Sequence, residues 1–236
     1  MRILPVIALL VGLGFSGGLA WAFLKPESNE RPTPFSSVIP ARPEFQFEPP
    51  PPGSYRLNHI KSAPDGRVLD TDGHAQTLAD LTQGKITLVS FVYLMCGDVN
   101  GCPLAMSTLF ELHDASAQLP GLNRDVQLMT ISFDPERDTV DAIHAFAYPI
   151  LSDTAAREKF DWHVLTTGGM ADLQPILDGY GQVIDRSTDQ DQISHLLRLY
   201  LVDRAGQIRN VYGLGTIDPR LLMTDIETLL MEDRQP

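Results

Sequence analysis

The chain has 236 residues, of which 43% are hydrophobic, so it is long and apolar enough to bury a substantial core. Its formal net charge is −12 at pH 7. Because nucleic-acid binding needs a basic surface to neutralise phosphates, this composition excludes nucleic acid as a partner. The chain has only two cysteines, which excludes a scaffold held together by many disulfides.

The first 24 residues differ from the rest. No charged residue occurs from Ile3 to Leu24, a run of 22 positions, and about 20 apolar residues are enough to cross a bilayer. The tripeptide Ala20-Trp21-Ala22 also fits the cleavage pattern of a signal peptide. We therefore predict that residues 1–24 are a single-pass inner-membrane anchor with the remainder on the periplasmic side. The alternative is a cleaved signal peptide and a protein secreted to the periplasm.

Residues 25–53 are predicted to be a linker. This segment holds nine of the eighteen prolines of the chain. Such a composition favours extended polyproline II, which rises about 3.1 Å per residue and would hold a domain away from a membrane. The globular domain is accordingly predicted to span residues 54–236.

Within that domain, predicted strands and helices alternate along the chain. In order, they are a β-hairpin within 55–69 near the turns Asp65-Gly66 and Asp72-Gly73, a helical turn at 78–81, a buried strand at 86–93, a helix after Pro103, a strand at 126–133, a helix at 138–147, a strand at 162–165, a helix at 170–180, strands at 197–202 and 208–212, and a helix at 218–231 capped by Asp218. Trp162 and Tyr212 are predicted core residues. The alternation indicates an α/β fold, a mixed sheet flanked by helices.

Both cysteines lie in the turn between the strand at 86–93 and the helix after Pro103. Cys96 and Cys102 have five residues between them, two of which are glycine. A strand, a cysteine-bearing turn and a helix in this order indicate a thioredoxin-like arrangement. Thiolates are soft ligands and good nucleophiles, so the pair indicates either a copper(I) site or a dithiol/disulfide redox centre. Since Cys102 precedes Pro103, a helix N-terminus is expected to lower the pKa of its thiol.

A metal site with two thiolates needs a further ligand, commonly histidine. Five of the six histidines are predicted to be ordinary surface or partly buried residues: His59, His74, His113, His144 and His163. His195 differs because it follows a polar, turn-rich segment and opens the apolar strand beginning near Leu197. In a thioredoxin-like sheet that segment can fold over the cysteine turn.

Several sequence motifs together resemble the SCO/SenC family of copper-insertion proteins of cytochrome oxidase assembly. The motifs are Phe91-Val-Tyr93 with Cys96 and Cys102-Pro103, Ile131-Ser-Phe-Asp-Pro-Glu-Arg-Asp-Thr139, Trp162-His-Val-Leu-Thr166, and His195-Leu-Leu-Arg-Leu-Tyr-Leu-Val-Asp203 with Gly206. The resemblance covers roughly residues 54–232, and the anchor and linker also match the family's layout.

The resemblance implies that Cys96, Cys102 and His195 bind copper. It further implies that Asp134 supports the site or contacts a partner, although Asp134 would equally suit a cap for the helix at 138–147. This chain departs from the family in having five residues rather than three between its cysteines. The longer loop could admit Asp98 as a ligand, and Met95 and Met106 could offer thioethers, but packing or exposure is the simpler interpretation of both methionines.

The leading functional hypothesis is a membrane-tethered metallochaperone that delivers copper to a cuproprotein, in particular a cytochrome oxidase subunit. The alternative is an enzyme, a thiol-disulfide reductase in which Cys96 and Cys102 are catalytic and act on the cysteine pair of a cuproprotein. A redox sensor with a reversible disulfide and a static disulfide are further alternatives. Whether the chain is an enzyme is therefore left open by the sequence.

Overall fold

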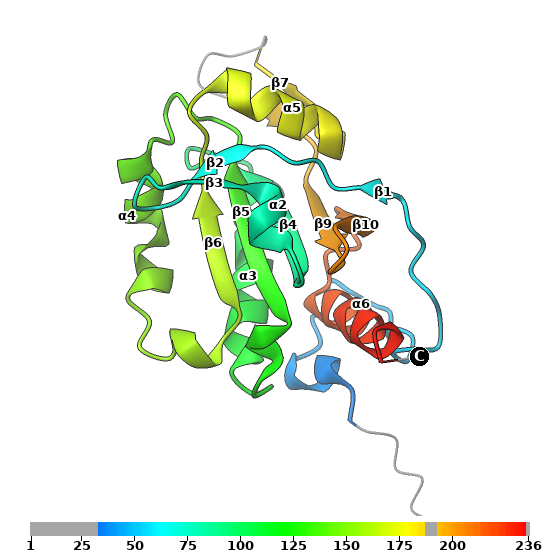
Figure 1. The fold of residues 1–236 in the computed structure, drawn as a ribbon. Helices are drawn as coiled ribbons and strands as arrows, with labels where there is room; N and C mark the ends of the chain where they lie inside the picture. Colours follow the sequence, from blue (N-terminus) through cyan, green and yellow to red (C-terminus); the bar gives the residue numbers. More distant parts are fainter. Residues whose placement is uncertain (1–32, 187–192, 235–236) are drawn as a thin grey trace, which may run out of the picture. The chain divides into compact units, whose positions relative to one another are not determined.

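Two apolar segments form the central strands of a six-stranded sheet in the computed structural model, which describes residues 33–186 and 193–234. β4 (Ile86–Val92) and β5 (Val126–Ser132) are buried at every position, as expected for parallel strands covered on both faces. The strand order is β1-β10-β9-β4-β5-β6, in which β4, β5 and β6 are parallel and β9 is antiparallel to β4. The carboxyl ends of the parallel strands point toward α5 and β7 (Figure 1).

The other elements follow the predicted alternation. The remaining strands are β1 (Lys61–Ser62), β2 (Arg67–Leu69), β3 (Ala75–Thr77), β6 (Asp161–Leu165), β7 (Ile184–Asp185), β8 (Ser194–His195), β9 (Arg198–Val202) and β10 (Gln207–Gly213). The helices are α2 (Leu78–Thr82), α3 (Cys102–Ser116), α4 (Val140–Leu151), α5 (Met170–Tyr180) and α6 (Pro219–Glu232), with 3-10 turns η1 (Phe35–Val38), η2 (Leu122–Arg124) and η3 (Ala156–Glu158). The predicted mixed α/β architecture is confirmed.

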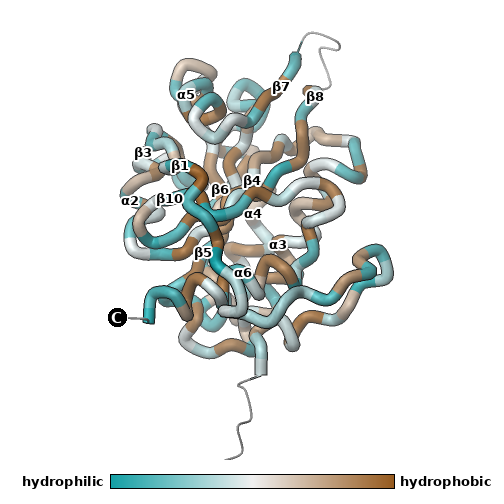
Figure 2. Tube along the Cα trace, turned by 90° about the vertical axis from the view of Figure 1, so that its right-hand side faces the viewer, coloured by the Kyte–Doolittle hydropathy of each residue, from teal (hydrophilic) through white to brown (hydrophobic). Residues whose placement is uncertain are grey.

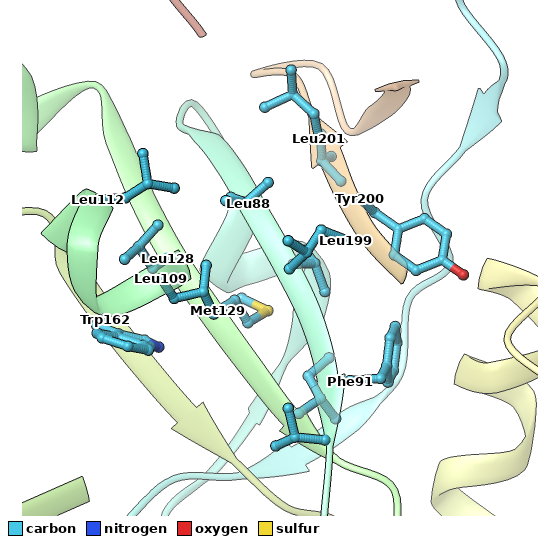
Figure 3. Close-up of a cluster of buried hydrophobic side chains, with 14 of the residues drawn as sticks. Leu88, Phe91, Leu109, Leu112, Leu128, Met129, Trp162, Leu199, Tyr200 and Leu201 are labelled. Carbon is cyan, nitrogen blue, oxygen red and sulfur yellow. The ribbon is translucent and has the colours of Figure 1, made fainter. Parts of the chain in front are cut away.

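The core forms where α3 lies against the central strands. Figure 3 shows Leu109 and Leu112 of α3 close to Leu88 of β4 and Leu128 of β5, and all four side chains are fully buried. The spacing of Leu109 and Leu112 places both side chains on one face of α3. This packing fixes the helix that begins at Cys102. Trp162 and Tyr212 are also buried, as the sequence predicts.

The early hairpin differs from the expectation. β2 pairs with β3 around the Asp72-Gly73 turn, so the hairpin lies at 67–77 rather than within 55–69. β1 instead pairs with β10 at the edge of the main sheet. A two-residue strand has too little pattern to reveal its partner, and only the tertiary structure brings residues 61–62 beside β10.

The described part of the predicted linker packs on the domain. The compact unit begins at Pro34, and η1 lies against α6. We refer to residues 34–53 as the N-terminal arm. Ile39 in the arm is 4% exposed, and the apolar side chains scattered among its prolines provide surface to bury. Where the sequence predicts an extended spacer over 25–53, the structure therefore places residues 34–53 against the domain.

Hydrogen bonds to three residues of α6 hold the N-terminal arm, and one of them is from the Gly53 N–H to Thr228 Oγ1 at 3.1 Å. The Phe35 N–H donates to Glu227 Oε2 at 2.7 Å. The Arg220 guanidinium donates to the Phe47 carbonyl at 2.9 Å and is also paired with Asp218 at 2.8 Å. α6 is consequently buried along most of its length, including its polar residues.

Within residues 33–186 and 193–234, no helix combines the length and apolar character needed to cross a membrane. The predicted anchor or signal peptide at residues 1–24 lies outside the described residues.

Candidate metal centre

The two cysteines flank a short loop between β4 and α3. Cys102 is the first residue of α3, and Cys96 lies in the connection after β4. Asp98 stabilises the loop between the cysteines through two hydrogen bonds. Its Oδ1 accepts from the Asn100 N–H at 3.0 Å, and its backbone carbonyl accepts from the Gly101 N–H at 2.9 Å. Both thiols are free; Cys102 is buried and Cys96 is half-buried. The five-residue spacer therefore folds as a turn that keeps the two sulfur atoms within 4.8 Å of each other.

His195 reaches the cysteines from a different part of the chain. It lies in β8, which pairs with β7 to form a separate two-stranded ladder (Figure 2). Its Nε2 is 3.6 Å from the Cys102 Sγ. The ligand atoms of Cys96, Cys102 and His195 all lie within 4.8 Å of one another. The three residues predicted as metal ligands thus converge at one point.

A backbone contact assigns the histidine tautomer. His195 Nδ1 lies 3.1 Å from the Ile193 carbonyl oxygen. A carbonyl can only accept, so in the neutral form of the ring Nδ1 carries the proton and the lone pair on Nε2 faces Cys102. This is the arrangement in which a histidine is ready to ligate a metal through Nε2.

Aromatic side chains enclose the imidazole. The Phe133 ring centroid is 4.8 Å from that of His195, and the Tyr93 ring stands edge-on to it at 5.9 Å. A cavity of about 350 Å³ opens beside Tyr93, Cys96 and His195. The candidate ligands therefore have an apolar wall on one side and an accessible opening on the other.

Burial, rather than the helix terminus, dominates the chemistry of Cys102. Removal from water raises the pKa of the Cys102 thiol well above its usual range, whereas the sequence predicts a lowered pKa. A buried thiolate without a nearby positive charge is costly, and a bound cation would supply that charge. Two sulfurs and one imidazole nitrogen form a donor set that suits copper.

Behind the site, buried carboxylates join the strand ends to the loops that carry the ligands. Asp138 Oδ2 accepts hydrogen bonds from Ser132 Oγ at 2.6 Å and from the Leu94 N–H at 3.1 Å, which ties β5 to the cysteine loop. Asp134 is 1% exposed and pairs with Arg186 at 3.1 Å, which ties β5 to the end of β7. Both contacts position the ligand-bearing segments.

The N-terminal cap of α4 is Thr139, not Asp134 as the sequence suggested. The side chain of Thr139 caps α4 by accepting from the Ala142 N–H. The supporting contacts of Asp138 and Arg186 are not evident from the sequence. The clustering of charged residues around 134–138 is a signal for a buried network, but it does not identify the partners.

The other candidate ligands stay apart from the centre. Asp98 lines the cavities beside the site but is not part of the three-ligand cluster. Met106 is buried at 8% exposure, while Met95 is 69% exposed. None of the other five histidines joins Cys96 and Cys102 in the described ranges.

Comparison with known proteins gives consistent matches over the domain. A sequence model of the SCO1/SenC family matches residues 61–231. The SCO1 protein homolog of Bacillus subtilis (strain 168) is 26% identical over 145 residues, which cover 60% of this chain and 68% of that protein.

Solved structures match the fold of the chain. The copper-bound structure of Bradyrhizobium japonicum ScoI is 25% identical, with a TM-score of 0.55, and the match covers 71% of this chain and 99% of that chain. A second solved structure is that of BsSco, a member of the Sco family of cytochrome c oxidase assembly proteins in which a disulfide switch was identified. It is 19% identical to this chain with a TM-score of 0.57, and the match covers 75% of this chain and 98% of that chain. The central sheet flanked by helices is thus thioredoxin-like, as in Sco structures.

Proposed function

This chain belongs to the SCO1/SenC family, and from that premise we propose that it is an extracytoplasmic copper-binding protein that delivers copper to a cuproprotein. The proposed ligands are Cys96 Sγ, Cys102 Sγ and His195 Nε2. The observation that carries the proposal is the convergence of these three atoms within 4.8 Å, although they come from the loop after β4, the start of α3 and β8.

The donor set suits transfer of copper rather than permanent storage. Two thiolates and one imidazole match the preference of Cu(I) for soft ligands. Three protein ligands leave a position that a ligand of the recipient can enter, so copper can pass between proteins by exchange of ligands. The copper-bound structure of the Bradyrhizobium japonicum relative supports copper as the cargo.

The surface beside the site suits a protein recipient. Large apolar side chains are exposed around the ligands: Met95 at 69% and Val99 at 73% on the cysteine loop, and Leu196 at 59% and Leu214 at 64%, which line a cavity together with His195. Exposed apolar side chains gathered at a site are typical of protein interfaces. We propose a cytochrome oxidase subunit as the recipient, in keeping with the assembly role stated for the Sco family.

We further propose that the domain works on the periplasmic side of the inner membrane. The uncharged run from Ile3 to Leu24 supports either an anchor or a signal peptide. An anchor would keep the copper site close to a membrane-embedded oxidase.

Anaerobic copper titration of the reduced full chain tests the proposal. We expect one equivalent of Cu(I) to bind, with thiolate-to-Cu(II) charge-transfer bands after addition of Cu(II). Binding should be lost in Cys96→Ser, Cys102→Ser and His195→Ala and retained in His59→Ala, a control at an exposed histidine. Stoichiometric binding that survives in both Cys96→Ser and His195→Ala would contradict the proposed site.

A second candidate function is thiol-disulfide reduction of a cuproprotein. It is favoured by the pairing of a half-buried Cys96 with a buried Cys102. The Cys96 thiolate would attack a partner disulfide and release one partner thiolate, forming a mixed disulfide. Cys102 would then attack Cys96 Sγ, which releases the second partner thiolate and leaves a Cys96–Cys102 disulfide. The partner is reduced and this chain is oxidised by two electrons.

The two functions differ in their need for the histidine. Reductase activity should persist in His195→Ala, whereas copper binding should not. Rapid reduction of a cysteine-pair substrate without stoichiometric copper binding would favour the reductase.

A further inference from the structure

The Tyr93 hydroxyl connects the cysteine loop with the strand that carries His195. Tyr93 directly follows β4 and is 4% exposed. The Ile193 N–H donates to the Tyr93 hydroxyl oxygen at 3.4 Å. Residues 93 and 193 are one hundred positions apart, so this contact is purely tertiary.

The same residue, Ile193, also holds the imidazole. Its carbonyl accepts the Nδ1–H of His195 at 3.1 Å, and the opposite ring nitrogen faces Cys102 Sγ at 3.6 Å. The backbone of Ile193 therefore links the Tyr93 hydroxyl on one side to the tautomer and ring orientation of His195 on the other.

The strand that carries His195 needs such support. β8 has two residues and, among the described residues, pairs only with the two residues of β7, and an isolated two-stranded ladder is marginally stable in water. The ring of Tyr93 also stands edge-on to the imidazole, with an interplanar angle of 84°. The tyrosine thus provides both a hydrogen-bond acceptor and a packing wall.

We propose that Tyr93 is a positioning residue that orients His195 through the Ile193 backbone and so sets the geometry of the three-ligand centre. The effect on copper rests on the proposed function, whereas the orientation of His195 does not.

The variant Tyr93→Phe removes the hydroxyl and keeps the ring. The metal-free, reduced full chain is labelled with ¹⁵N, and the imidazole nitrogens of His195 are recorded at pH 8 and assigned by their absence in His195→Ala. We expect a single Nδ1–H tautomer in the unsubstituted chain and a mixture of tautomers in Tyr93→Phe. Tyr55→Phe is the matched control, because it removes another tyrosine hydroxyl bond, to Asp225 on α6.

Copper affinity is the second readout. Loss of a residue that supports a metal ligand typically costs about 10–100-fold in affinity, so Tyr93→Phe should bind Cu(I) at least about 10-fold more weakly than Tyr55→Phe in competition with a chelator. If no variant binds copper but the His195 spectrum changes, the proposed function fails and the positioning role stands. An unchanged His195 spectrum in folded Tyr93→Phe overturns the inference whatever copper does.

If Tyr93→Phe does not fold, hydrogen exchange of the Ile193 amide in the unsubstituted chain decides. Exchange slower than that of a free amide is expected for a donor engaged with Tyr93. Exchange at the free rate would overturn the inference.

Discussion

Asp138 connects the fold to the metal centre at the level of a single carboxyl group. It is buried at 1% exposure, and burial raises its pKa even though hydrogen bonds from Ser132 and Leu94 oppose the shift. The native state therefore binds more protons than the unfolded state between the two pKa values. By linkage, the contribution of Asp138 to stability falls as pH rises from its unfolded pKa to its higher folded pKa.

Asp138→Asn removes this titration but keeps an oxygen that can accept from Leu94. We expect the stability of the unsubstituted chain relative to Asp138→Asn to be greatest at low pH and to shrink as pH rises. Urea unfolding of both proteins from pH 4 to pH 8 measures the difference. Asp141→Asn, which neutralises an exposed carboxylate on α4, corrects for the change in net charge. A difference that stays constant or grows with pH would contradict the expectation.

At the scale of elements, the N-terminal arm is part of the domain. Its contacts cover α6, where Glu227 accepts from Phe35 and Arg220 donates to Phe47. The arm also buries Ile39. A chain without the arm would expose one side of α6 to water.

A chain that starts at residue 54 should be less stable than one that starts at residue 34. We expect a loss of about 1.5–3 kcal/mol, since the arm buries Ile39 and burial of one large apolar side chain is worth roughly that much. Chemical denaturation of the two chains tests this. Equal free energies of unfolding would mean that the arm contributes no net stability.

The helix that starts at Cys102 depends on its buried face. Leu109 is fully buried between α3 and the sheet, so Leu109→Ala should lower the free energy of unfolding by about 2–5 kcal/mol. Ser107→Ala, at an exposed position of the same helix, should change it by less than about 0.5 kcal/mol. Thermal or urea unfolding compares the two variants. Similar losses in both would indicate that α3 is not held by its buried face.

For the whole molecule, copper should act as a stabilising ligand because its proposed ligands lie close together only in the folded chain. At free copper about 100 times above Kd, linkage adds about 2.7 kcal/mol, which corresponds to a rise in Tm of about 5–10 °C for a protein of this size. Calorimetry of the reduced full chain with and without Cu(I) measures the shift, and removal of copper with a chelator should reverse it. The same shift in His195→Ala would place the bound copper elsewhere.

Local pattern was sufficient for much of the fold and for the identity of the candidate ligands. The apolar runs at 86–93 and 126–133 predict buried strands because parallel central strands need apolar side chains on both faces. Cys96 and Cys102 are recognisable because they are the only cysteines and lie at one strand-to-helix turn. The order of helices and strands follows from such short-range signals.

The sequence by itself determined the mixed α/β class, the strand-turn-helix around the cysteines and His195 as the candidate third metal ligand. Only the tertiary structure decided the pairing of β1 with β10, the packing of the N-terminal arm on α6 and the burial that raises the pKa of Cys102. It also decided the contact of Tyr93 with Ile193. Local periodicity reflects which side of an element is buried, whereas these features depend on contacts between residues far apart in the chain, which no short-range pattern encodes.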